Sequence, residues 1–185
     1  VTVPAFPVTV PLVTVSVGRT VAVVVLLIGL VGVGTMATNA LRCLVELYDG
    51  IEEILCTSRR PETREAFAAK WSEKLGIRVV PKDSIEAVVR NADIGIGGTT
   101  SDEIMCKESW LKPGATYVSF TRREFEPAGW AKVDKVVVDS WEMNMLMKHF
   151  RNSSETGLFT RQMLHGEIHE LVREKVAGRE SDTER

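Results

Sequence analysis

The chain has 185 residues, a formal net charge of −2 and three cysteines. This length suits one domain with a substantial core and is short for two. The small net charge, without a stripe of Lys and Arg along one helix face, argues against a nucleic-acid partner. The widely spaced Cys43, Cys56 and Cys106 suit reduced thiols in a cytoplasmic protein. We expect Cys43, on a helix, and Cys56, in a strand, to be small core residues.

Composition divides the chain into three parts. Residues 1–20 are expected to be an extended or disordered lead, because their prolines fit no regular helix and confine any strand to a sheet edge. Residues 21–178 are expected to form one domain, and the polar residues 179–185 a frayed tail.

An uninterrupted apolar run at residues 21–33 opens the second part. A run without alternation predicts a strand buried on both faces. It is too short for a membrane-spanning helix, which needs about 20 apolar residues, and it is rich in valine and ends in glycines. A signal-peptide core is harder to exclude by length, but cleavage there would destroy the turn that follows.

That turn has the pattern G-x-G-x-x-A. Gly32 can take the tight strand-to-helix turn, Gly34 has no Cβ to keep a pyrophosphate from the backbone, and Ala37 permits close helix packing. The helix start then offers N–H groups and a positive dipole end to phosphate. The alternative is a glycine-rich turn that binds nothing. The predicted cofactor-binding residues of this turn are Gly32, Val33, Gly34, Thr35, Met36 and Ala37.

Strand and helix patterns alternate along the rest of the domain, which predicts the α/β class. The expected fold is Rossmann-like and doubly wound, a mostly parallel sheet with helices on both faces. We also expect residues 158–176 to form one amphipathic helix, and the segment 141–150, with its methionines, to pack a helix on the sheet. The expected helices are 36–48, 61–75 and one ending near 90. The expected strands are 53–57, 77–80, 115–120 and 135–138, with a fourth strand in the stretch 91–101 that ends in a loop of glycines and hydroxyl residues.

The end of the second strand indicates which dinucleotide is bound. An Asp or Glu there would accept hydrogen bonds from the ribose and repel a 2′-phosphate, but the chain has Ser58, Arg59 and Arg60. A hydroxyl and guanidinium groups suit a phosphate, which favours NADP(H), with NAD(H) as the alternative. The other interpretation is that the two arginines are a solvated surface pair.

The fourth strand ends in a hydroxyl-rich loop that contains Thr99, Thr100 and Ser101. Ligands bind outside the carboxyl ends of strands in open α/β sheets, so this loop is expected beside the Gly32 turn. Its residues would contact the ribose or nicotinamide side of the cofactor, or simply cap a turn.

Two clusters of ionisable residues are not assigned to a functional site. His165 and His169 have a spacing that can bind metal, but no third ligand accompanies them, so no metal site is predicted. Arg122, Arg123 and Glu124 are interpreted as a surface charge cluster in preference to a lining of the cleft.

The order of short motifs resembles the ornithine cyclodeaminase and mu-crystallin family. This resemblance implies a nicotinamide-binding Rossmann domain that is paired, in the family, with a separate substrate domain. The matching motifs are G-V-G-T-M-A at 32–37, S-R-R-P-E at 58–62, N-A-D-I at 91–94, T-T-S at 99–101, W-L-K-P-G-A at 110–115, V-V-V-D at 136–139, G-E-I-H-E-L at 166–171 and A-G-R at 177–179.

Two departures bear on activity. The family's substrate domain occupies well over a hundred residues before the first glycine turn, and here the chain begins shortly before Gly32. The family's aspartate for proton transfer, expected after the strand that ends at Phe120, is missing from the stretch that follows. We therefore expect the NADP(H)-binding part of an oxidoreductase for an imine or amino acid, with no catalytic residue assigned. The alternatives are an ornithine cyclodeaminase and a crystallin-like protein that holds NADP(H) without catalysis. The expected partners are the dinucleotide and a small substrate, with a homodimer as one option for assembly.

Overall fold

The computed structural model describes residues 25–101, 103–120 and 124–185. The lead predicted at residues 1–20 lies outside the described residues. Strands and helices alternate in the first part of the chain, as expected. Its elements are β1 (Leu26–Val31), α1 (Thr35–Leu47), β2 (Ile51–Thr57), α2 (Pro61–Leu75), β3 (Arg78–Pro81), α3 (Ile85–Val89), β4 (Ile94–Gly97), the 3-10 helix η1 (Glu108–Trp110) and β5 (Thr116–Ser119).

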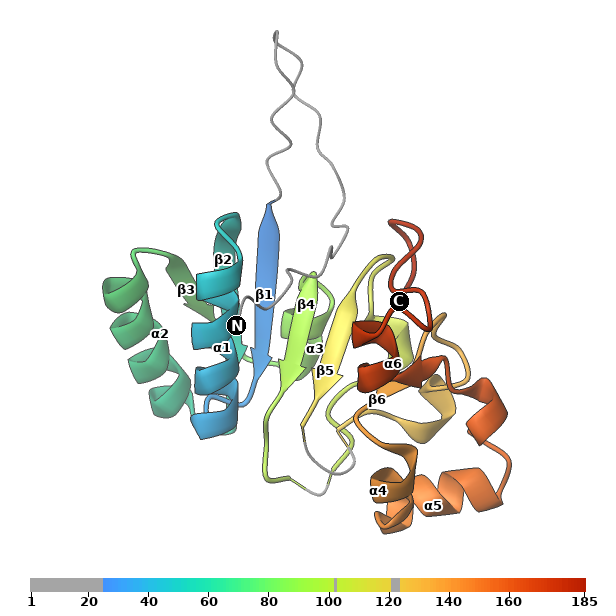
Figure 1. Ribbon diagram of the computed structural model, residues 1–185. Helices are drawn as coiled ribbons and strands as arrows, with labels where there is room; N and C mark the ends of the chain where they lie inside the picture. The colour runs from blue at the N-terminus through green and yellow to red at the C-terminus, as the bar shows by residue number, and fades with distance from the viewer. Residues whose placement is uncertain (1–24, 102, 121–123) are drawn as a thin grey trace, which may run out of the picture.

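Five of the described strands form one parallel sheet in the order β3-β2-β1-β4-β5. The chain moves outward from β1 to β3, then returns to place β4 on the other side of β1 (Figure 1). Helices α1 and α2 pack on one face of the sheet and α3 on the other. This confirms the predicted Rossmann-like, doubly wound fold, whose topological switch point lies between β1 and β4.

Local signals in the sequence account for the helix boundaries. Pro61 begins α2, where its missing N–H removes no hydrogen bond, and Gly76 ends it in the left-handed conformation at φ 66°. Helix α3 is capped by Ser84, whose Oγ accepts a 3.1 Å hydrogen bond from the Ala87 N–H.

The α3 face of the sheet is closely packed because glycines occupy it. A Cβ on Gly29 would lie 2.7 Å from the Ala92 Cβ and 2.9 Å from the Val88 Cγ1. A Cβ on Gly95, in β4, would lie 2.7 Å from the ring of Tyr117. Helix α3 and the Tyr117 ring can therefore approach the backbone of the central strands directly.

Residues 127–185 form a second lobe beside β5 (Figure 1). Its core is an aromatic cluster in which Trp130, Trp141, Phe150 and Phe159 meet at ring-centroid distances between 5.1 and 6.2 Å. The elements of the second lobe are the 3-10 helix η2 (Pro127–Gly129), β6 (Val137–Val138), α4 (Trp141–Met145), α5 (Lys148–Glu155), the 3-10 helix η3 (Arg161–Met163), β7 (Gly166–Glu167) and α6 (Ile168–Val172).

Three expectations about packing were wrong. The segment 141–150 packs within the aromatic cluster of the second lobe and not on the sheet, and Met143 is exposed. The strand expected at 135–138 is β6, which pairs with β7 and lies outside the five-stranded sheet. Cys43 is exposed, because α1 turns the opposite side toward the core, whereas Cys56 is buried as expected.

The single helix predicted at 158–176 is also wrong. Gly166 and Glu167 pair in parallel with Val137 and Val138, and Glu167 then caps α6 through its N–H to the Glu170 carboxylate at 2.9 Å. A glycine in a helix interior costs about 1 kcal/mol. At Gly166 this cost, the strand pairing and the new helix cap together outweigh the amphipathic pattern that predicted one continuous helix.

The tail, which was expected to be frayed, makes specific contacts. Arg179 Nη2 donates to Thr116 Oγ1 at 2.9 Å, and the Gly114 N–H donates to the Thr183 carbonyl at 3.0 Å. These bonds attach the end of the chain to the start of β5.

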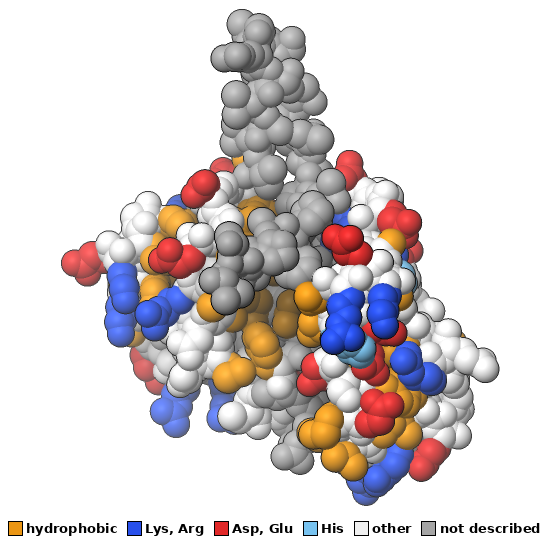
Figure 2. Space-filling view, viewed as in Figure 1, with side chains coloured by type: hydrophobic (Ala, Val, Ile, Leu, Met, Phe, Trp, Pro, Cys, Tyr) orange, Lys and Arg blue, Asp and Glu red, His pale blue; other side chains and the backbone are white. Residues whose placement is uncertain are grey.

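One stretch of the sheet is less well covered. Val118 and Phe120 are exposed on the face of β5 that continues the α1 side of the sheet, since Val118 pairs in register with Ile96 of the α1-side core. Figure 2 shows hydrophobic side chains on the near face of the sheet, between α1 and the second lobe.

We predict that Gly29→Ala lowers the free energy of unfolding by about 1 to 3 kcal/mol, because the added methyl group overpacks the contact with α3. Urea denaturation followed by circular dichroism measures the change. Gly178→Ala is the control, since a Cβ there meets no atom within 4 Å. Equal stability of the two variants would contradict the predicted close packing.

Candidate functional site

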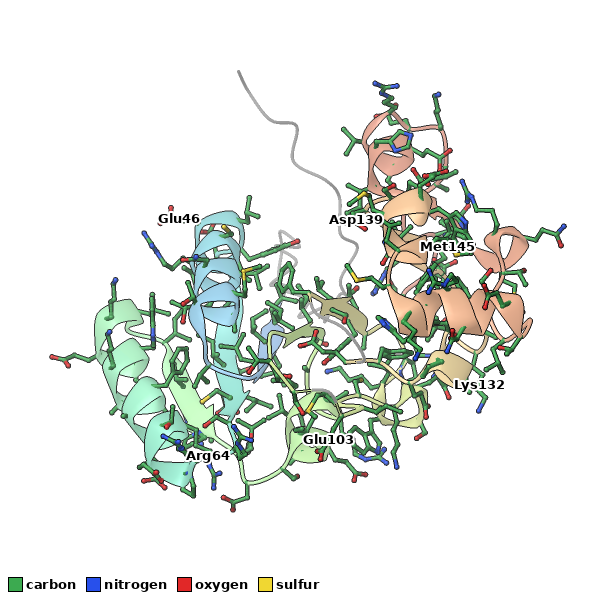
Figure 3. All side chains as sticks on the ribbon, turned by 90° about the horizontal axis from the view of Figure 1, so that it is seen from below. Glu46, Arg64, Glu103, Lys132, Asp139 and Met145 are labelled. Carbon is green, nitrogen blue, oxygen red and sulfur yellow. The ribbon has the colours of Figure 1, made fainter. Side chains whose placement is uncertain are left out.

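A cleft of about 880 Å³ lies at the carboxyl ends of β1, β2 and β4. Three loops that the sequence singles out line it together, although they are far apart along the chain. Figure 3, which looks toward this end of the sheet, places Arg64 on the α2 side and Glu103 near the loop after β4. The predicted residues that line the cleft are Gly32, Val33, Gly34, Ser58, Arg59, Arg60, Thr99, Thr100 and Ser101.

Gly32 takes the strand-to-helix turn in a conformation that other residues rarely adopt, with φ at +91°. A Cβ there would lie 2.9 Å from the Gly98 carbonyl oxygen and 3.1 Å from Thr99 Cγ2. The first glycine of the motif is therefore required by the fold itself, because it lets the loops after β1 and β4 touch.

Gly34 differs, because its absent side chain faces open space. A Cβ there would have the Gly98 oxygen, at 3.9 Å, as its nearest neighbour. Gly34 is the N-cap of α1, no side chain caps this helix, and its first turn contains no acidic residue. The start of α1 thus presents backbone N–H groups and a positive dipole end toward the cleft. This fits the requirements of a bound phosphate.

The remaining residues of the motif form the first turn of α1. Thr35 and Met36 are exposed and do not line the cleft. Ala37 is fully buried, and a Cβ on Gly98 would lie 3.3 Å from the Ala37 Cβ. The small side chain of Ala37 therefore brings α1 close to the loop after β4.

The loop after β2 is held by an arginine that the sequence motif did not include. Arg64 Nη1 donates to the Ser58 carbonyl oxygen at 3.2 Å, and Arg64 Nη2 forms an ion pair with Asp83. The Arg64 side chain is only 11% exposed, whereas that of Asp83 is 96% exposed. In the sequence, Arg64 follows Pro61 by one helical turn and lies near the end of β2. This position is the signal that could have identified Arg64.

The rest of this loop presents positive charge to the cleft. The Ser58 hydroxyl donates to the Arg60 carbonyl oxygen at 2.9 Å, which shapes the turn. Arg59 and Arg60 are exposed and line the cleft. No carboxylate stands at the end of β2 itself.

The loop after β4 is fixed from several sides. The Gly98 N–H donates to the Val31 carbonyl oxygen at 2.9 Å, and the Ser101 N–H donates to Thr99 Oγ1 at 3.2 Å. The Thr99 N–H donates to Glu124 Oε1 at 2.7 Å. The prediction that Glu124 belongs to a surface charge cluster was wrong, because the residue is completely buried beneath this loop. Its predicted neighbours Arg122 and Arg123 lie outside the described residues.

The buried thiols near the sheet are unsuited to act as nucleophiles. Burial raises the pKa of Cys56 to about 11, although the nearby Arg64 charge acts in the opposite direction. Burial also raises the pKa of Cys106, with the Glu126 charge adding to the effect. Both thiols stay protonated near neutral pH.

The two histidines of the second lobe have separate partners. His165 Nε2 contacts the Ala177 carbonyl oxygen at 2.7 Å, and His169 Nδ1 lies 3.3 Å from Glu167 Oε2. Within residues 25–101, 103–120 and 124–185, no three His, Cys, Asp or Glu side chains come together as a metal site would require. None of the helices in these ranges has the length and hydrophobicity needed to cross a bilayer.

Comparison with known proteins agrees with this architecture. A family model described as "Ornithine cyclodeaminase/mu-crystallin family" matches residues 24–185. The chain belongs to this family.

Two curated relatives that this ornithine cyclodeaminase/mu-crystallin chain matches are named as a dehydrogenase and a reductase. An N-((2S)-2-amino-2-carboxyethyl)-L-glutamate dehydrogenase from Staphylococcus aureus is 27% identical over 157 residues, which cover 84% of this chain and 47% of the relative. A Delta(1)-pyrroline-2-carboxylate reductase from Bacillus cereus is 30% identical over 162 residues, covering 84% and 49%. The chain thus spans about half the length of the curated relatives that it matches.

A solved structure of this family gives the same result for the fold. The Thermococcus litoralis Delta(1)-pyrroline-2-carboxylate reductase, in complex with NADH and L-proline, is 28% identical to the chain and superposes with a TM-score of 0.79. The superposition covers 86% of this chain and 51% of that one.

The two glycines of the motif should respond differently to substitution. We predict that Gly32→Ala lowers the free energy of unfolding by about 1 to 3 kcal/mol, because the positive φ and the contact with the Gly98 oxygen both become unfavourable. Gly34→Ala should lower it by less than about 1 kcal/mol, as expected for an N-cap exchange. Urea denaturation of both variants checks this, and similar losses would contradict the division of roles.

Proposed function

We propose that this chain supplies the NADP(H)-binding domain of an oxidoreductase that acts on an imine or an amino acid. The observation that carries the proposal is a single cleft that joins the open start of α1 to the arginines after β2. In a doubly wound sheet, a dinucleotide binds across the carboxyl ends of the strands at the switch point, which is where this cleft lies.

The start of α1 would hold the pyrophosphate. Support comes from Gly34, whose missing side chain leaves open space in front of the helix N-terminus, so phosphate oxygens can reach backbone N–H groups. A pyrophosphate here would place the adenosine half toward β2 and the remaining half toward β4 and β5, because the dinucleotide crosses the sheet edge.

The preference for NADP(H) rests on the loop after β2. Arg59 and Arg60 are exposed guanidinium groups in the cleft, and a guanidinium can bind a phosphate through two parallel hydrogen bonds. Asp83 and Glu86 are carboxylates that also line the cleft, and their ion pairs with Arg64 and Arg90 offset their repulsion of a 2′-phosphate. The Thermococcus litoralis relative was solved with NADH, so the preference is argued from this chain's own residues.

The reaction class is proposed from the relatives. The curated relatives carry the names of a dehydrogenase and a reductase, which favours reduction of an imine, or its reverse, over the ring closure of a cyclodeaminase. When bound, the nicotinamide supplies the hydride, while the protein binds and orients the cofactor. A small amino acid or imine is the proposed substrate class. The unpaired thiols favour a cytoplasmic location.

We predict that Gly34→Val reduces the affinity for NADPH more than tenfold while the chain stays folded, because the side chain would occupy the space before the helix N-terminus. Isothermal titration calorimetry measures binding, and circular dichroism checks the fold. Gly178→Val, on the second lobe, is the matched control. Unchanged NADPH binding by a folded Gly34→Val variant would exclude this turn as the phosphate site.

We further predict that the chain binds NADPH more tightly than NADH, and that Arg59→Ala with Arg60→Ala weakens NADPH about tenfold with little effect on NADH. The reason is the loss of charge-assisted hydrogen bonds that only the 2′-phosphate can use. Lys148→Ala with Arg151→Ala, at two exposed cations of α5, removes the same two positive charges and is the control for net charge. A wild-type preference for NADH in the same titrations would contradict the assignment.

A further inference from the structure

Glu124 is a buried carboxylate that joins the ends of two strands. Its side chain is completely shielded from solvent. Its Oε1 accepts the Thr99 N–H at 2.7 Å, and its Oε2 accepts the Phe120 N–H and the Ser119 hydroxyl, each at 3.0 Å. One carboxylate therefore binds the loop after β4 and the end of β5 at the same time.

The strands leave a space of defined shape for this group. A Cβ on Gly97 would lie 2.7 Å from both Glu124 Oε2 and the Tyr117 hydroxyl. Tyr117 lies along the glycines of β4, and its hydroxyl has no hydrogen-bond partner among the residues that the structure describes. Burial raises the pKa of Tyr117, and the nearby Glu124 carboxylate adds to the effect, so the phenol stays neutral.

Burying a carboxylate costs free energy unless hydrogen-bond donors are already oriented toward it. Among the donors that the described residues supply, two are backbone N–H groups, of Thr99 after β4 and of Phe120 after β5. Any shift of the loop after β4 away from β5 would leave a buried acceptor without its partner. Glu124 consequently restricts the position of the loop that contains Thr99, Thr100 and Ser101.

We propose that Glu124 is a positioning residue for the nicotinamide half of the dinucleotide. This inference rests on the proposed function, which places the adenosine half toward β2 and the remaining half toward β4 and β5. Glu124 acts through the loop after β4 and touches neither the α1 start nor the arginines after β2. Its influence should therefore fall on one half of the ligand only.

Glu124→Gln tests this, because the amide keeps the shape of the side chain but replaces one acceptor oxygen with a donor. One of the two backbone N–H groups then faces an NH₂ group. We expect NADPH to bind about tenfold more weakly, as for a hydrogen bond lost to a charged group, while 2′-phospho-ADP-ribose, which lacks nicotinamide, binds within twofold of wild type. The fluorescence of NADPH bound to the saturated variant should also differ from that of NADPH in the wild-type complex.

The matched control is Glu126→Gln. Glu126 Oε1 accepts the Glu108 N–H at 2.8 Å, so the same chemical change occurs two residues away without a bond to the loop after β4. It should leave both affinities and the fluorescence unchanged. If Glu124→Gln does not fold by circular dichroism, Ser119→Ala removes one donor to Glu124 and should weaken NADPH about threefold, again without affecting 2′-phospho-ADP-ribose.

The outcomes separate the two proposals. If wild type binds neither ligand, the proposed function fails and this inference falls with it. If wild type binds both, but Glu124→Gln weakens both equally or neither, the proposed function stands and the positioning role is overturned. Selective loss of NADPH affinity with altered nicotinamide fluorescence supports the role.

Discussion

The close approach of the turn after β1 to the loop after β4 is the contact on which the site depends. It exists because Gly32 adopts a positive φ and because neither Gly32 nor Gly98 carries a side chain. Ala37 completes the contact from the first turn of α1. The same arrangement that ends β1 therefore directs the helix start toward the carboxyl edge of the sheet, where its N–H groups and dipole face the cleft.

Around this contact, the two sides of the cleft are built by different physical means. Toward β2, exposed guanidinium groups stand on a loop that the mostly buried side chain of Arg64 holds through a backbone carbonyl. Toward β5, the buried Glu124 binds backbone N–H groups of two loops. One side offers exposed positive charge, and the other restrains backbone position by a desolvated carboxylate. Such a division suits a ligand with a charged end and an end that must be oriented.

The second lobe has a hydrophobic core of its own. Its aromatic cluster excludes water on its own, so its helices need not cover the sheet. Strands β6 and β7 pair with each other inside the second lobe. The tail returns to the start of β5, where Arg179 contacts Thr116. These contacts join the lobe to the edge of the sheet and leave Val118 and Phe120 exposed on β5.

The sequence alone determined the alternation of strands and helices, the glycine turn and the arginines after β2, because buried strands, helix stops and G-x-G turns are local signals. It could also predict that the Thr99 loop lies beside the turn, since parallel strands share one edge. Only the tertiary structure decided the roles of Arg64 and Glu124. Their charges look like ordinary surface groups in the sequence, and the fold buries them and brings Asp83 to Arg64 and Thr99 to Glu124. The same reason explains residues 158–176: a helical period is local, but the pairing of Gly166 and Glu167 with β6 is made across the fold and outweighs it.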